Sequence, residues 1–220
     1  NDPLVEYLVT KKRYRADHLI EAHVEGVRVD GKTIEELNAI IKEHDIKSPD
    51  GNDLSEVKQF NLMFETQIGK TEGDKQAVYL RPETAQAIFV NFKHVLDTSR
   101  KRLPFGIAQI GKAFRNEITP GNFTFRTLEF EQMEIEYFIH EQDWEQMFDE
   151  WLAWMEGWAE SLGIDTSRLH RLEVPEESLA HYSKRTVDIE FDYPFGTKEL
   201  WGLAYRTSFD LTNHMEHCGQ

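Results

Sequence analysis

The sequence predicts an α+β fold in which an antiparallel β-sheet is flanked by helices. Two observations carry this prediction. Segments that alternate apolar and polar residues follow one another along the chain with short turns between them, which is the pattern of β-hairpins. Segments with apolar residues every three or four positions stand between these hairpins, which is the pattern of helices packed on a sheet.

The composition predicts a globular protein with one sizeable core. The chain has 220 residues and a formal net charge of −15, which argues against a generally basic surface for nucleic acid. Two short basic runs, 11–15 and 99–102, remain candidates for a local patch. The apolar runs are too short to span a bilayer and the first residues do not resemble a signal peptide, so we expect a cytoplasmic protein without a membrane partner.

A single cysteine, Cys218, excludes an internal disulfide and a zinc cluster built from several cysteines.

The chain divides into two predicted domains. Residues 1–58 form a mostly helical insertion segment, because 15–26 and 33–46 place apolar residues at helical spacing. Residues 59–220 contain the antiparallel sheet.

Two helices are predicted within 59–220. The first follows a strand, with Pro82 and Glu83 in its first turn, where a proline and an acid are both favoured. Its core-facing residues are Ala85, Ile88, Phe89, Phe92 and Val95. The second occupies 141–163, and its sheet-facing residues are Trp144, Phe148, Trp151, Met155, Trp158 and Leu162. Strands 186–193 and 199–211 then pair through a turn, with Val187, Ile189, Phe191 and Tyr193 on one face.

The hairpin over 111–138 mixes charged, amide and aromatic residues on one face. Residues two apart in a strand point the same way, so each arm contributes one set of side chains to this face. The first arm contributes Ile107, Gln109, Gly111, Ala113, Arg115 and Glu117, and the second contributes Phe130, Gln132, Glu134, Glu136 and Phe138.

Two interpretations of this mixed face stay open on the pattern alone. It is either a solvated face with Arg–Glu pairs, each worth at most about 1 kcal/mol, or the floor of a pocket for a phosphate, a flat base and an ammonium group. The opposite face favours the second interpretation, because its apolar character predicts that it is the covered one. That face carries Ala108, Ile110, Phe114, Met133, Ile135 and Tyr137.

The segment "FRNEITPGNFTFRTLEFEQMEIEYF" resembles the second signature motif of class II aminoacyl-tRNA synthetases. Together with "YLRPETAQAIFVNFKHVL", "LPFGIAQIGKAF", "AHYS", "TVDIEFDYPFG" and "ELWGLAYRTSFDL", it is similar to the bacterial-type homodimeric glycyl-tRNA synthetases over nearly the whole chain. The resemblance implies a partial class II catalytic core. It also implies ATP-dependent activation of glycine and transfer of the glycyl group to tRNA(Gly).

The same resemblance implies the site residues. Arg115 would act in catalysis by binding the α-phosphate and the glycine carboxylate, Glu117 would accept from the adenine amino group, and Phe130 would stack on adenine. The implied ATP-binding set is Arg115, Asn116, Glu117, Phe125, Arg126, Thr127, Leu128, Glu129, Phe130, Glu199 and Leu200. The implied glycine-binding set is Arg15, Glu83, Phe130, Glu131, Gln132, Met133, Glu134 and Arg206.

ATP is expected as a substrate with Mg²⁺, whose ligands the sequence does not place, and a homodimer is expected for the full-length protein. The first motif should precede Asn1, the third motif and the anticodon-binding domain should follow Gln220, and the isolated piece should be inactive. Four positions depart from the usual family residues: Leu128 for arginine, Ala87 for glycine, Ser208 for an acid and Cys218 for serine. Leu128 and Ser208 motivate an alternative, a non-catalytic accessory or nucleic-acid-binding relative.

Overall fold

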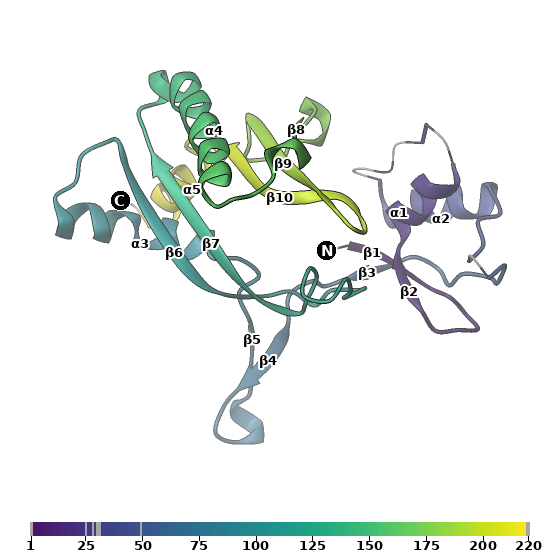
Figure 1. Ribbon diagram of the computed structural model, residues 1–220. Coiled ribbons are helices and arrows are strands. Elements are labelled where there is room, and N and C mark those ends of the chain that lie inside the picture. Colours follow the sequence, from purple (N-terminus) through teal and green to yellow (C-terminus); the bar gives the residue numbers. More distant parts are fainter. Residues whose placement is uncertain (1, 25, 28, 30–31, 49, 219–220) are drawn as a thin grey trace. The chain divides into compact units, whose positions relative to one another are not determined.

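The structure is a computed structural model that describes residues 2–24, 26–27, 29, 32–48 and 50–218 (Figure 1). The elements in chain order are β1 (Asp2–Glu6), β2 (Arg13–Arg15), α1 (Ala16–His23), α2 (Ile34–Glu43), β3 (Lys58–Phe60), β4 (Glu65–Ile68), β5 (Gln76–Tyr79), α3 (Ala85–Ser99), β6 (Phe105–Phe114), β7 (Glu129–Phe138), α4 (Trp144–Ser161), β8 (Leu169–Glu173), β9 (Arg185–Tyr193), β10 (Gly196–Tyr205) and α5 (Phe209–Cys218). This mixture of helices and antiparallel strands confirms the α+β fold class.

The strands of the described residues fall into four small sheets. Their strand orders are β2-β1-β3, β10-β9-β8, β4-β5 and β6-β7. The chain divides into two compact units, which are described separately below. Unit 1 comprises Asn1–Thr84 and Ile110–Gln132, and unit 2 comprises Ala85–Gln109 and Met133–Gln220. The predicted domain boundary after residue 58 stays a prediction.

Unit 1 has its own core, built from both helices and strands of its N-terminal part. Helix α2 begins with a capping box, in which the Thr33 hydroxyl accepts from the Glu36 N–H and the Glu36 carboxylate accepts from the Thr33 N–H. This helix buries Leu37 and Ile41 in the core. The expectation of a mostly helical segment missed β1 and β2, because Leu4 and Val5 are buried consecutively and give no alternating pattern.

Unit 2 contains two further clusters of buried side chains. In the first, Ala85, Ile88 and Phe89 of α3 pack with Phe105 and Phe138, which confirms the predicted core face of that helix. Helix α3 begins at Ala85, so Pro82 and Glu83 precede its first turn rather than occupy it. The predicted first-turn position was therefore wrong, because Glu83 and Pro82 lie two and three residues before the start of the helix.

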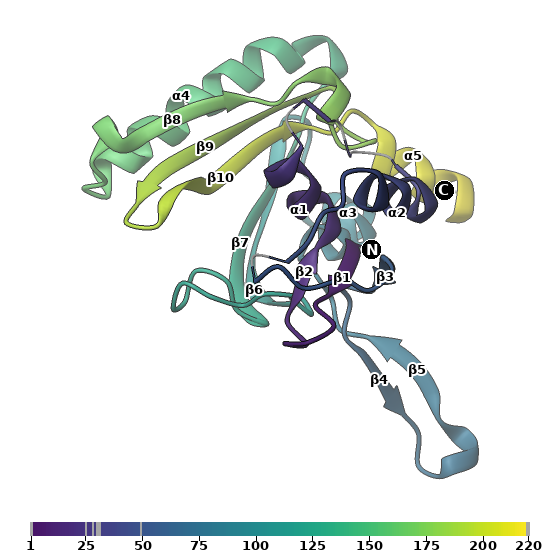
Figure 2. The same cartoon turned by 90° about the vertical axis from the view of Figure 1, so that its right-hand side faces the viewer.

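The second cluster of unit 2 lies between α4 and the β8–β9–β10 sheet (Figure 2). Phe148 and Leu152 of α4 pack on Val187 and Ile189 of β9, the face predicted for that strand. Leu162, which was expected to face the sheet, follows the end of the helix and is 56% exposed. The periodic pattern was extended one residue too far.

The two faces of the β6–β7 hairpin are covered in the opposite way to the prediction. The mixed face of β7 is half-buried through Phe130, Gln132, Glu134 and Glu136 and ends at the buried Phe138. The apolar face is the exposed one, with Ile110, Met133, Ile135 and Tyr137 all open to solvent. Alternation in sequence identifies residues that share a face, but the neighbours that cover that face are set by the tertiary structure.

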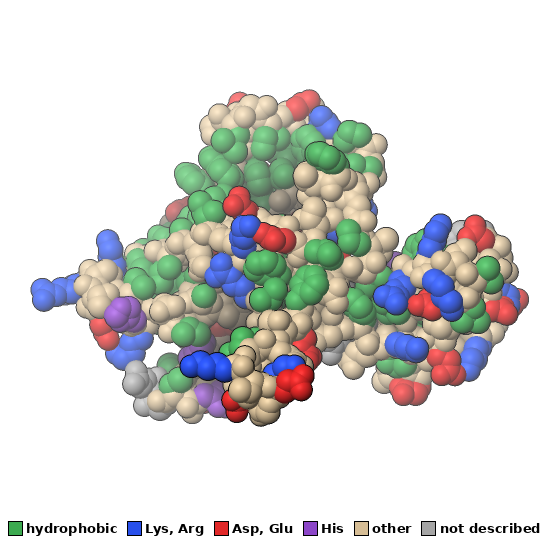
Figure 3. Space-filling model, turned by 90° about the horizontal axis from the view of Figure 1, so that it is seen from below, with side chains coloured by type: hydrophobic (Ala, Val, Ile, Leu, Met, Phe, Trp, Pro, Cys, Tyr) green, Lys and Arg blue, Asp and Glu red, His purple; other side chains and the backbone are tan. Residues whose placement is uncertain are grey.

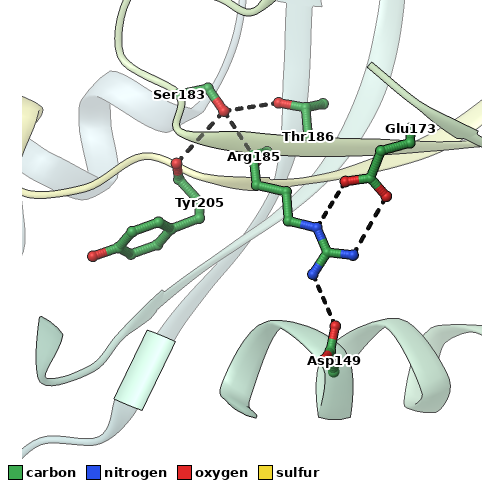
Figure 4. A network of polar contacts seen from close by, with 6 residues as sticks. All are labelled: Asp149, Glu173, Ser183, Arg185, Thr186 and Tyr205. Carbon is green, nitrogen blue, oxygen red and sulfur yellow. Dashed lines mark hydrogen bonds and ion pairs between the residues drawn. The ribbon is translucent and has the colours of Figure 1, made fainter. Parts of the chain in front are cut away.

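An ionic network joins α4 to two strands of unit 2 (Figure 4). Arg185 of β9 donates from Nε to Glu173 Oε1 at 2.7 Å and from Nη1 to Asp149 Oδ1 at 2.8 Å. Its guanidinium carbon lies 4.3 Å from the centre of the Phe148 ring. Because the Arg185 side chain is only 29% exposed, it contributes packing as well as charge.

We predict that Arg185→Ala lowers the free energy of unfolding by about 1–3 kcal/mol, since it removes two ion pairs and a cation–π contact. Chemical denaturation followed by tryptophan fluorescence measures the change. Arg171→Ala is the matched control, because the ion pair described for Arg171 is with Glu156 and its side chain is 56% exposed. The free energy of unfolding of this variant should fall by less than about 1 kcal/mol. Equal losses in the two variants would contradict the network's role.

Candidate functional site

Arg115 follows β6, and its guanidinium is held in place by a hydrogen bond from Nε. Its Nε donates to the Pro82 carbonyl at 3.0 Å, and its main-chain N–H donates to the Leu128 carbonyl at 3.0 Å. Its guanidinium carbon lies 5.4 Å from the centre of the Phe130 ring. Within the described residues, the two terminal nitrogens have no hydrogen-bond partner. A fixed guanidinium with both terminal nitrogens open can bind phosphate or carboxylate oxygens in a bidentate fork.

Phe130 is placed on the same half-buried side of β7 as Gln132 and Glu134 by the two-residue repeat of the strand. Its ring beside Arg115 combines a flat apolar surface with a cation. This pair could bind an aromatic base that carries a phosphate. Glu129, Glu131 and Met133 alternate with these residues, so their side chains point to the exposed face. Any contact of theirs with a ligand on the Phe130 side would use main-chain atoms.

Glu117 pairs with Arg126 within unit 1. Arg126 Nη1 donates to Glu117 Oε2 at 3.2 Å, and the Glu117 side chain is only 13% exposed. Arg126 also closes the loop through two main-chain hydrogen bonds with Gly121. The half-buried Thr127 donates from its hydroxyl to the Glu129 carbonyl at 2.7 Å, which orders the return into β7. The loop therefore holds one carboxylate and one guanidinium as an ion pair.

Glu83 is anchored by its two neighbours in sequence. The carbonyl of Pro82 accepts from Arg115, and the N–H of Thr84 donates to Gln132 Oε1 at 3.2 Å. The segment 82–84 is thus tied to both arms of the hairpin. The half-buried Glu83 lies between these two tie points, so the structure brings it close to Arg115 and Gln132.

The remaining predicted residues of unit 1 have separate settings. Asn116 donates from its main-chain N–H to the Leu62 carbonyl at 2.7 Å. Phe125 is half-buried and Leu128 is exposed in the loop before β7. Arg15 ends β2 and binds Asp17 through Nε at 3.1 Å and Nη2 at 2.6 Å. These two hydrogen bonds tie Arg15 to the start of α1.

In unit 2, Arg206 has a half-buried and well-defined setting. It binds Asp210 of α5 through Nε at 2.9 Å and Nη2 at 3.1 Å. Burial disfavours the charged form and lowers the pKa of Arg206, but the bonds to Asp210 outweigh burial and the net pKa is raised. The charge of Glu136 acts in the same direction, so Arg206 stays protonated in this setting. Glu134 is half-buried on the same face of β7 as Glu136.

Glu199 and Leu200 lie at an irregularity of the β9–β10 pairing. Glu199 stands opposite Glu190, and the register shifts between Glu199 and Trp201, where Leu200 is the extra residue. Asp188 stands opposite Gly202, and a Cβ added to that glycine would lie 2.8 Å from Asp188 Oδ1 and 3.5 Å from Glu199 Oε1. Gly202 therefore leaves room for two carboxylates on one sheet face.

Sequence reasoning missed three features beside the predicted residues. Tyr182, Asp210 and the carbonyl of Pro82 each contact a predicted arginine directly. The spacing of Arg206 and Asp210, four residues apart where α5 begins, could have indicated that pair. Nothing in the sequence pattern identifies a main-chain carbonyl as the partner of Arg115.

Three of the four basic side chains in the run at 11–15 have an acidic partner. Lys11 and Arg13 both lie within ion-pair distance of Glu6, and Arg15 binds Asp17. Figure 3 shows acidic and basic side chains interspersed on the face that it displays. A shallow hollow along α2, lined in part by Asn38 and Val57, includes none of the predicted site residues.

Two absences hold for the described part of the chain. No three histidine, cysteine, aspartate or glutamate side chains there are placed to hold a metal ion together. None of the helices there is both long and apolar enough to cross a membrane.

Comparisons with known proteins identify relatives of the chain. Residues 64–219 match the family described as "tRNA synthetase class II core domain (G, H, P, S and T)". The whole chain is 52% identical to a protein named glycine–tRNA ligase from Geobacillus kaustophilus (strain HTA426), of which it covers 49%. It is 50% identical to the protein of that name from Bacillus anthracis and 48% identical to that from Caldanaerobacter subterraneus subsp. tengcongensis, again covering 49% of each. The chain thus spans about half the length of these curated relatives.

We predict that Asp188→Asn stabilises the protein at pH 7, by at most about 1 kcal/mol after allowance for solvent screening. Burial, with a smaller contribution from the charge of Glu190, raises the pKa of Asp188 in the folded protein. The folded state therefore binds its proton more tightly than the unfolded state, and ionisation costs stability as pH rises through the folded pKa. The gain should disappear at pH values below the ordinary carboxyl pKa.

Asp192→Asn is the matched control on the same face of β9. Hydrogen bonds from Thr197 and then His170 hold the pKa of Asp192 below its usual value, so its stabilising effect is present at neutral pH and lost in acid. This variant should be destabilised at pH 7. Denaturation curves at pH 3 and pH 7 measure both effects, and a loss of stability in Asp188→Asn at pH 7 would contradict the assignment.

Proposed function

Because this chain belongs to the class II tRNA synthetase core family, we propose that it forms part of the catalytic domain of a glycine–tRNA ligase. The reaction has two steps. A carboxylate oxygen of glycine attacks the α-phosphorus of ATP, the bond to the β-phosphate oxygen breaks, and pyrophosphate leaves. A hydroxyl of the terminal ribose of tRNA(Gly) then attacks the glycyl carbonyl, and AMP leaves.

The setting of Arg115 is the observation that carries the proposal. Its Nε is occupied by the Pro82 carbonyl, and its two terminal nitrogens have no partner within the described residues. In the proposed reaction these nitrogens bind the α-phosphate and the glycine carboxylate. Negative charge builds on the α-phosphoryl oxygens as the carboxylate attacks, and a preorganised guanidinium stabilises that charge without having to move.

Phe130 and Glu117 are proposed to hold the adenine. The Phe130 ring, 5.4 Å from the Arg115 guanidinium carbon, offers a stacking surface next to the phosphate-binding group. Glu117 Oε2 is engaged by Arg126, so Oε1 is the oxygen proposed to accept from the adenine amino group. We propose that Asn116, Phe125, Arg126, Thr127, Leu128, Glu129, Glu199 and Leu200 complete the nucleotide site.

Glu83 and Glu134 are proposed to bind the ammonium group of glycine, and Arg206 its carboxylate. Both glutamates are half-buried, where a carboxylate binds a cation more strongly than in open water. Glycine has no side chain to grip, so selectivity must come from the ammonium group and from the exclusion of bulk. Arg15, Phe130, Glu131, Gln132 and Met133 are proposed to line the same amino-acid site.

Mg²⁺, a homodimer and a cytoplasmic location belong to the same proposal. Mg²⁺ commonly binds through substrate phosphates and one or two carboxylates and does not require an all-protein cage. A carboxylate face such as that of Asp188 and Glu199 suits this kind of binding in the chemistry of its donors. The metal would neutralise phosphate charge, while Arg115 acts on the α-phosphoryl group itself.

We predict that Arg115→Ala lowers kcat/KM for glycine-dependent exchange of pyrophosphate into ATP by at least about 100-fold, since it removes the charge that stabilises the transition state. The full-length gene product that carries these residues is the protein to assay. Arg115→Lys should be intermediate, because an ammonium group keeps the charge but not the fork.

Arg171→Ala is the control for this experiment, because it removes an exposed arginine whose partner is Glu156. It should leave exchange unchanged. Undiminished exchange in Arg115→Ala would overturn the role of Arg115. Exchange that depends on an amino acid other than glycine, in a panel of the twenty, would overturn the substrate assignment.

A further inference from the structure

Arg206 is held by a bidentate ion pair in unit 2. Its Nε and Nη2 bind the two carboxylate oxygens of Asp210, and both side chains are only 17% exposed. A pair with two parallel hydrogen bonds fixes the plane of the guanidinium as well as its position. Partial burial strengthens the pair, because water screens it less than it screens a surface ion pair.

Aromatic rings fix the same guanidinium from other directions. The guanidinium carbon of Arg206 lies 3.8 Å from the ring centre of Tyr182 and 5.1 Å from that of Phe89. The Tyr182 ring is itself supported, since His181 contacts both Tyr182 and Phe209 edge to face. The Arg206 side chain therefore has little freedom to change rotamer.

The main chain next to Arg206 is strained. Thr207 has a φ of +57°, which is a rare and unfavourable conformation for a β-branched residue. This residue forms the turn between the end of β10 at Tyr205 and the start of α5 at Phe209. Asp210 follows Arg206 by four residues, and the turn brings the two side chains into hydrogen-bond contact. Strain of this kind is retained where the surrounding structure requires one particular geometry.

The ion pair with Asp210, together with the Tyr182 ring, forms a clamp on Arg206 that occupies only part of the guanidinium. Asp210 takes Nε and one hydrogen of Nη2, and within the described part of the chain Nη1 has no hydrogen-bond partner. The edge between Nη1 and Nη2 is the edge with which arginine binds a second carboxylate. Arg206 thus combines a fixed position with open donors.

We infer that Asp210 and Tyr182 are positioning residues, which hold Arg206 so that its Nη1–Nη2 edge receives the carboxylate of the amino-acid substrate. The inference rests on the proposed function, since it assigns the clamp to the glycine site. The competing explanation is a structural lock, in which Arg206 only joins α3, α5 and the segment around Tyr182.

Steady-state pyrophosphate exchange by the full-length gene product tests the inference. Asp210→Asn keeps the size of the side chain but cannot accept both hydrogen bonds, and Tyr182→Leu removes the ring face. Each should raise KM for glycine about tenfold or more, with kcat within threefold and KM for ATP unchanged. Asp210→Glu, which keeps the carboxylate, should lie between Asp210→Asn and the wild type. Rates are normalised to the active-site concentration.

Glu156→Gln is the matched control, because Glu156 forms a comparable bidentate pair with Arg171 in the same unit. It should leave KM for glycine unchanged. A glycine KM within twofold of wild type in Asp210→Asn and Tyr182→Leu would overturn the inference. A smaller fraction of active enzyme with an unchanged KM would also overturn it, because that is the result expected if Arg206 is only a structural lock. If Asp210→Asn does not fold, the KM for glycine of Tyr182→Leu and Asp210→Glu tests the inference instead. A wild-type protein without glycine-dependent exchange would overturn the proposed function and, with it, this inference.

Discussion

The two-residue repeat of β7 is the constraint on which the candidate site depends. It places Phe130, Gln132, Glu134 and Glu136 on one half-buried face and ends that face at Phe138, which is buried in the α3 cluster. A shift of one residue would turn every one of these side chains to the exposed side. The packing of Phe138 therefore fixes the register that also aims the polar residues.

In each unit, polar side chains are fixed by short-range bonds that leave selected donors open. Arg115 and Arg206 each use Nε for an internal partner, the Pro82 carbonyl in one case and the Asp210 carboxylate in the other. The remaining nitrogens can then bind a ligand without loss of side-chain entropy at the moment of binding. The raised pKa of Asp188 in β9 and the positive φ of Thr207 beside Arg206 are costs to stability in unit 2. Such costs are typical of functional sites.

Much of the architecture could be predicted from the sequence because periodicity reports it directly. The core face of α3 and the buried face of β9 follow from spacings of three to four and of two residues. The strands β1 and β2 could not be recognised, because both are short and β1 buries the consecutive residues Leu4 and Val5. The prediction of which face of the β6–β7 hairpin is covered was wrong, because the covered face depends on residues outside the hairpin, such as Phe89 of α3, which packs on Phe138.

The sequence proposes the residues of the candidate site but not their geometry. The resemblance to a known family supplied the roles of Arg115 and Glu134, which alternation alone left open between a salt-bridged surface and a pocket floor. Two of the groups that hold the arginines, the Pro82 carbonyl and the Tyr182 ring, come from segments that only the folded chain brings beside them, whereas Asp210 is four residues from Arg206. The side chain of Leu128, where the resemblance implies an arginine, is exposed, while its carbonyl accepts from the Arg115 N–H.

The dissociation constant of a non-hydrolysable glycyl-adenylate analogue, measured by calorimetry on two adjacent variants of β7, tests the central claim most directly. Glu134→Gln changes the half-buried face and Ile135→Ala changes the exposed face, one position further along the same strand. The account predicts that Glu134→Gln weakens binding at least tenfold, while Ile135→Ala stays within twofold of wild type. Equal weakening in both variants, or no effect of Glu134→Gln, would contradict it.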